Sequence, residues 1–67
     1  MNKLKELRVK ALLTQADLAA KAGVDKSTVR AIEGGQPARL LTLAHLAAAL
    51  NVPLETLENL AIDEGEL

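Results

Sequence analysis

Apolar residues recur at spacings of three and four along most of the chain, a pattern typical of short amphipathic helices. In residues 3–11 the apolar face consists of Leu4, Leu7 and Ala11, and Asn2 can cap the start of this helix. The same periodicity returns in later stretches, and β-type alternation is not sustained. The sequence therefore predicts an all-α protein.

The most informative stretch runs from Thr14 to Gly35 and predicts two short helices joined by a tight turn. The first of them, residues 15–22, follows a hydroxyl cap at Thr14, and Asp17 can complete a capping box. Gly23 comes next, and glycine adopts the positive φ of a helix C-terminus without steric cost.

The second helix of the pair, residues 26–33, is predicted to begin at an Asp25 cap and to end at Gly34 and Gly35. Ala19 is small where two steeply crossing helices must approach closely, so the spacing fits a helix-turn-helix motif. The apolar positions between the two helices are Leu18, Ala19, Ala22, Val24, Val29 and Ile32.

Pro37 interrupts the chain after this motif and imposes a loop. The next helix is predicted to begin near Leu41 or Thr42 and to end at about Leu50. Its buried stripe at i, i+3, i+4 and i+7 consists of Leu43, Leu46, Ala47 and Leu50.

A last helix is predicted over residues 54–60, after a left-handed turn at Asn51. So small a domain cannot bury every leucine, and an exposed apolar patch usually marks a contact. We therefore expect Leu54, Leu57 and Leu60 to form the interface of a symmetric homodimer. The alternative is that Leu57 and Leu60 close the core of a single copy. Residues 1–62 would form the domain, and residues 63–67 a frayed acidic tail.

Composition narrows the possible functions. The 67 residues contain no cysteine and a single histidine, so neither a disulfide nor a protein-built metal site is expected, and no cofactor. Phe, Tyr and Trp are absent, which removes the stacking surfaces of most single-strand nucleic-acid binders. No catalytic constellation occurs in a supporting context, so neither an enzyme nor a small-molecule ligand is expected. No segment predicts a signal peptide or a membrane span.

The net charge of −1 hides an asymmetry along the chain. Residues 1–40 hold all eight Lys and Arg and four acidic residues, for a net charge of +4. Residues 41–67 hold five acidic residues and no Lys or Arg, for a net charge of −5. This division is consistent with a basic face and an acidic end. It is equally consistent with basic and acidic side chains that are simply solvated.

The stretch from Thr14 to Gly35 resembles the phage-repressor and Cro-like (XRE-type) helix-turn-helix family. The flanking residues 4–15 and 38–53 resemble the family's opening and fourth helices, so the likeness covers about residues 3–61. It implies a compact five-helix repressor-like DNA-binding domain with a central helix-turn-helix. The residues that carry it are Thr14, Gln15, Leu18, Ala19, Gly23, Val29, Ile32, Glu33 and Gly35.

In such a domain the helix at residues 26–33 enters the major groove, with its N-terminal residues nearest the base edges. Val29 and Ile32 are expected to point inward. The outer face then consists of Lys26, Ser27, Arg30 and Ala31.

Each polar residue of this helix offers specific chemistry to DNA. Lys26 can donate to guanine, Ser27 can donate or accept, and Ala31 can pack on a thymine methyl group. Thr28 can bond a phosphate or touch a thymine methyl group, and Arg30 is long enough for either a phosphate or a base. Taken singly, any of them can be an ordinary surface residue.

The resemblance also implies contacts to the DNA backbone. A glutamine in the position of Gln15 opens the second helix and binds phosphate, and Gln36 and Arg39 would meet the backbone on the other flank. The chain departs from relatives that carry proline at Leu40 or an arginine near Leu41 that reaches the minor groove. A leucine cannot make that contact, so both leucines are expected to cover the core or a partner.

Family members with arginine seven residues before this glutamine commonly pair it with the glutamate before the closing glycine. Arg8 and Glu33 stand at these positions, so the resemblance implies a largely buried ion pair between them.

We therefore expect a cytoplasmic, bacterial or phage-encoded transcription regulator that binds double-stranded DNA as a homodimer. Repression is the expected sign, and no membrane association is expected. A protein-interaction module that keeps the fold with weak or no DNA binding is the alternative, which the acidic C-terminal half favours. Salt-dependent binding to duplex DNA separates the two.

Overall fold

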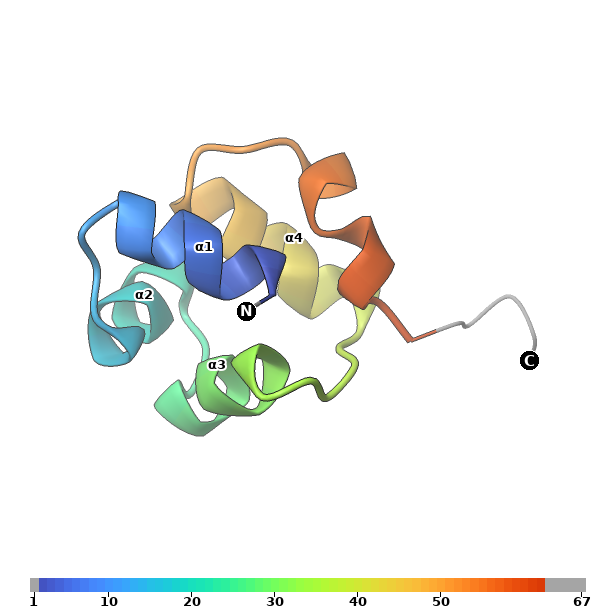
Figure 1. Ribbon diagram of the computed structural model, residues 1–67, viewed down its shortest axis with the longest axis horizontal. Helices are drawn as coiled ribbons and strands as arrows, with labels where there is room; N and C mark the ends of the chain where they lie inside the picture. Colours follow the sequence, from blue (N-terminus) through green and yellow to red (C-terminus); the bar gives the residue numbers. More distant parts are fainter. Residues whose placement is uncertain (1, 63–67) are drawn as a thin grey trace.

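The computed structural model describes residues 2–62, which form four α-helices and two short 3-10 helices (Figure 1). The helices α1 (Lys3–Lys10), α2 (Gln15–Ala22), α3 (Lys26–Glu33) and α4 (Leu40–Ala49) are followed by η1 (Leu54–Thr56) and η2 (Glu58–Leu60). The predicted acidic tail, residues 63–67, lies outside the described residues. None of the helices within residues 2–62 is long and apolar enough to cross a membrane.

The bounds predicted for α2 and α3 are confirmed, and the expectation of a fifth α-helix over residues 54–60 is wrong. The i to i+3 hydrogen bonds of this stretch include Leu57 N–H to Leu54 O at 2.9 Å and Leu60 N–H to Leu57 O at 3.0 Å. A segment this short has little intrinsic α-helical stability, so tertiary packing decides its conformation. Here Leu57 interrupts the two turns and enters the core.

The four α-helices share one way of ending. In each, the residue after the C-terminal turn has a positive φ, and the next N–H bonds back to a carbonyl five residues earlier, as in a Schellman motif. Gly23 and Asn51 confirm the predicted left-handed turns. Leu12 was not expected there, because a branched side chain disfavours this conformation. The four residues are Leu12 (φ 61°), Gly23 (φ 74°), Gly35 (φ 105°) and Asn51 (φ 58°).

Of the three N-terminal helix caps predicted from the sequence, two are confirmed. Asn2 Oδ1 accepts from the N–H of Lys5 at 3.1 Å, and the Thr14–Asp17 capping box is complete. Asp25 occupies the N-cap position of α3, but its side chain makes no capping hydrogen bond, so that expectation is wrong. The Asp25 carboxylate is exposed to solvent.

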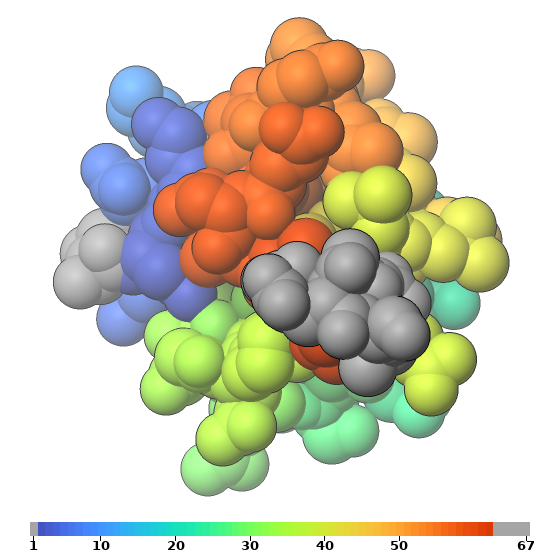
Figure 2. Space-filling view, turned by 90° about the vertical axis from the view of Figure 1, so that its right-hand side faces the viewer, coloured from blue at the N-terminus to red at the C-terminus, as the bar shows by residue number. Residues whose placement is uncertain are grey.

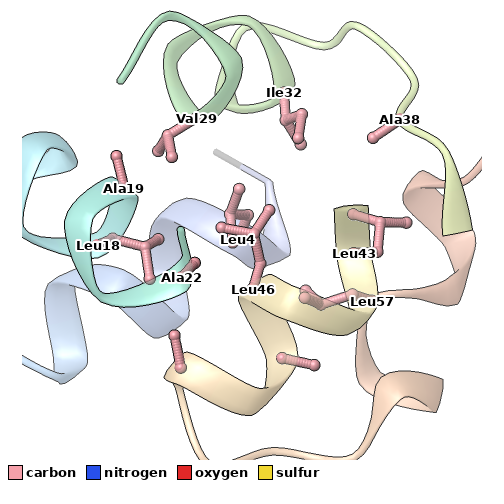
Figure 3. Packing of buried hydrophobic residues seen from close by; sticks show 12 residues of the cluster. Leu4, Leu18, Ala19, Ala22, Val29, Ile32, Ala38, Leu43, Leu46 and Leu57 are labelled. Carbon is pink, nitrogen blue, oxygen red and sulfur yellow. The ribbon is translucent and has the colours of Figure 1, made fainter. Parts of the chain in front are cut away.

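The core is built from leucines, alanines and two β-branched residues, Val29 and Ile32 (Figure 3). All four α-helices contribute to it, together with Ala38 and Leu57 from the connecting segments. Val29 and Ile32 extend from α3 toward Leu4, Leu43 and Leu46, which confirms their inward orientation. Ala11 is exposed, so its assignment to the apolar face of α1 is wrong, because α1 ends at Lys10. The fully buried large side chains are Leu4, Leu18, Leu43, Leu46, Leu57 and Val29.

Candidate nucleic-acid interface

One side of α3 is buried in the core, and the residues of the opposite side are exposed. In Figure 1 α3 lies at the bottom of the molecule, with α1 and α4 on the other side of the core. Val29 is fully buried and Ile32 is 2% exposed. The four residues expected on the opposite face, Lys26, Ser27, Arg30 and Ala31, are all exposed.

The end of α3 and the loop after it surround a shallow hollow. Five of the residues expected to touch DNA line it together: Ser27, Thr28, Ala31, Gln36 and Arg39. Lys26, Arg30 and Gln15 do not line the hollow, so the structure divides the expected DNA-contacting residues into two groups. The walls of the hollow carry hydroxyl, amide and guanidinium groups, all of which can form hydrogen bonds with phosphate oxygens or base edges.

The hollow also contains residues that sequence reasoning missed. Pro37, Thr42 and Ile62 also line it, together with the buried residues Ile32 and Ala38. Thr42 lies three residues after Arg39, and this helical spacing is the only sequence feature that could have placed Thr42 beside Arg39. No local pattern places Ile62 there, because its position depends on hydrogen bonds to a loop far away in sequence.

Those hydrogen bonds join the α3–α4 loop to the end of the described chain. Ala38 N–H donates to Leu60 O at 3.0 Å, and Ile62 N–H donates to Ala38 O at 2.8 Å. Ala38 and Ala61 thus form a single parallel bridge. Figure 2 shows the end of α3 and its loop, in light green, below the C-terminal segment, in orange to red. The bridge fixes one wall of the hollow.

At its C-terminal end α3 is joined to α1. Arg8 Nε donates to Glu33 Oε2 at 2.6 Å, and Arg8 Nη2 donates to Glu33 Oε1 at 3.0 Å. Their side chains are only 12% and 4% exposed. Arg8 Nη1 also donates to Leu13 O at 2.8 Å, and Asn2 Nδ2 donates to Ile32 O at 2.6 Å. The Asn2 bond satisfies a carbonyl at the end of α3, and together the four bonds hold this end of α3 against α1 and the loop that follows it.

The ion pair shifts the titration of both partners. Burial alone would raise the pKa of Glu33, but hydrogen bonds from Arg8 and Gln15 and the nearby positive charges of Arg8 and Lys5 bring this pKa below its usual value. The hydrogen bond to Glu33 raises the pKa of the Arg8 guanidinium. A negative charge at a helix C-terminus opposes the helix dipole, and Arg8 compensates for it.

Gln15 is part of this network. Its Nε2 donates to Glu33 Oε1 at 3.1 Å, so the amide that was expected on a phosphate is turned toward the end of α3. A primary amide carries a second N–H, and the first backbone N–H groups of α2 lack partners within the helix. Gln15 therefore joins α2 to α3 and still lies at a helix N-terminus that can accept an anion.

The three leucines expected at a dimer interface, Leu54, Leu57 and Leu60, differ in how deeply they are buried. Leu57 is fully buried in the core, so its assignment to an interface is wrong. Leu54 and Leu60 are half-buried and pack against the same core. Leu40 and Leu41 were expected to cover the core or a partner. Leu41 is 71% exposed and so does not cover the core, Leu40 is 41% exposed, and a partner contact stays a prediction.

Comparison with known proteins agrees with this geometry. A protein-family model described as helix-turn-helix matches residues 4–57, which is most of the chain. No curated protein and no solved structure matches the chain. The match spans α1 to α4 together with η1, and therefore includes α3 and the walls of the hollow up to Thr42.

Proposed function

The chain belongs to the XRE-type helix-turn-helix family of DNA-binding transcription regulators, and from this membership we propose that it reads double-stranded DNA by inserting α3 into the major groove. The observation that carries the proposal is the division of α3 into a buried apolar face and an exposed polar one. Its N-terminal residues Lys26 and Ser27 would face base edges.

Two groups of residues would have different tasks. Lys26, Ser27 and Ala31 supply groups that distinguish bases in the major groove. Gln15, Gln36 and Arg39 lie on the flanks of α3 and would hold the phosphate backbone, which fixes orientation without reading sequence. Thr28 and Arg30 can serve either task, because each reaches a base edge or a phosphate.

Two copies acting together would provide enough specificity for a regulator. An α3 of eight residues is about 12 Å long, so a single copy can contact only a few base pairs. A homodimer on two-fold-related half-sites, centred about 10 base pairs apart, would double this contact. We propose that occupancy of such a site represses transcription by excluding other proteins from the DNA.

Duplex binding measured at several salt concentrations tests the proposal. Lys26→Ala should weaken binding to the preferred site, because the variant loses a donor to the base edges. Lys10→Ala removes the same charge from the end of α1, outside the α3 face, and should leave site preference unchanged. Absence of salt-dependent duplex binding would favour a protein-interaction module in place of a DNA reader.

A further inference from the structure

The last described residue of the chain lies in the wall of the hollow beside α3. The bridge between Ala38 and Ala61 places Ile62 there, with its N–H bonded to the carbonyl of Ala38, the residue before Arg39. Both Ile62 and Arg39 line the hollow. Whatever follows Ile62 in the sequence therefore begins at the surface proposed to face DNA.

The residues that follow are strongly acidic. Asp63, Glu64 and Glu66 place three carboxylates within four residues of Ile62. Four residues can extend at most about 14 Å, which is comparable with the roughly 12 Å length of α3. At most four residues of chain therefore join these carboxylates to the wall of the hollow.

The hollow offers such a segment a positive partner. Arg39 is exposed, and within residues 2–62 it forms no ion pair. Ser27, Thr28 and Gln36 add hydroxyl and amide groups that can donate to a carboxylate. The same groups would donate to a DNA phosphate, so a carboxylate and a phosphate would compete for them.

We propose that the acidic segment 63–66 occupies the hollow beside α3 and competes there with the DNA backbone. This inference rests on the proposed function, because the competitor is duplex DNA. The segment lowers affinity for all duplexes by a similar factor, since it opposes phosphate contacts that carry no sequence information. Only sites with good base contacts are then occupied at a given protein concentration.

Two matched charge-neutralising variants test the competition. Asp63→Asn with Glu64→Gln removes two negative charges from the acidic segment, and Glu55→Gln with Glu58→Gln removes two from exposed positions in η1 and η2. The first variant should bind a mixed-sequence duplex about 3–10-fold more tightly at low salt, and the second less than about 2-fold. The gain should disappear at high salt and in an Arg39→Gln background. Equal gains in both variants, or no gain in the first, would overturn the proposal.

Amide NMR shifts of the DNA-free protein test the contact itself. The signals of Ser27, Gln36 and Arg39 should move in the Asp63→Asn/Glu64→Gln variant and stay in place in the control. Unmoved signals would overturn the contact, whatever the DNA measurements show. If no variant binds any duplex, the proposed function fails, while these shifts still decide whether the segment occupies the hollow.

Discussion

Arg8 and Glu33 lie 25 residues apart in the sequence and meet through two parallel hydrogen bonds. This bidentate geometry is the strong form of an arginine–carboxylate pair. Glu33 is the last residue of α3 and Arg8 belongs to the last turn of α1, so the pair holds the proposed reading helix against the opening helix. The same carboxylate accepts from Gln15 at the start of α2. One glutamate thus joins three helices.

Glu33→Gln should lower the free energy of unfolding by about 2–3 kcal/mol, because Arg8 would remain nearly buried without its charged partner. Arg8→Met should cost a similar amount. The double variant should cost less than the sum of the two, as expected for residues in direct contact. Urea unfolding of the four proteins at neutral pH measures these differences, and unchanged midpoints in both single variants would exclude a structural role for the pair.

The lowered pKa of Glu33 makes stability depend on pH in a defined direction. Its stabilisation is fully present above the pKa of an unfolded glutamate, about 4.3, and is lost as the pH falls through the lower pKa of the folded state. Urea unfolding between pH 7 and pH 3 should therefore show a smaller decline for Glu33→Gln than for the unmodified protein. An equal decline would mean that Glu33 does not titrate as the network requires.

Leu12 provides a site for stabilisation. It is 91% exposed and has a φ of 61°, so it pays the steric cost of a left-handed conformation with almost no burial in return. Leu12→Gly should raise the free energy of unfolding by about 0.5–1 kcal/mol, after allowing for glycine's greater freedom in the unfolded chain. Leu12→Ala retains Cβ and serves as the control. Thermal unfolding distinguishes them, and equal midpoints would contradict the strain.

The burial of Leu57 decides between its two predicted roles, in the core and at a dimer interface. Leu57→Ala should lower the free energy of unfolding by about 2–4 kcal/mol, because a fully buried leucine leaves a cavity. Leu41→Ala truncates a leucine that is 71% exposed and should change stability by less than about 0.5 kcal/mol. Circular dichroism during thermal unfolding compares the two. Similar small losses in both variants would place Leu57 outside the core.

Local chemistry made the helix-turn-helix predictable. Thr14, Asp17, Gly23 and the 26–33 periodicity act within a few residues, and the structure confirms the helix bounds and caps they indicate. The 3-10 turns could not be predicted from the sequence, and the sequence left open whether Leu57 closes the core or lies at an interface. Both depend on packing against α4 rather than on intrinsic preference.

In the candidate site too, local features were predictable from the sequence and long-range contacts were not. Periodicity alone places Lys26, Ser27 and Arg30 on the outer face of α3. The pairing of Arg8 with Glu33 came only from family resemblance, because nothing local connects residues so far apart. The bridge between Ala38 and Ala61 follows from no sequence pattern, since a single pair of backbone hydrogen bonds requires no particular side chains.

The most direct test of α3 as the reader of DNA is selection of bound duplexes from a random pool, followed by affinity measurements on the selected site. Lys26→Ala and Ser27→Ala should each lose about 1–3 kcal/mol on that site and relax its sequence at one or two base pairs. Arg39→Ala should weaken all duplexes alike and reduce the slope of log affinity against log salt by about one unit. If Lys26→Ala and Ser27→Ala both select the unaltered site with unaltered affinity, the exposed face of α3 does not read DNA.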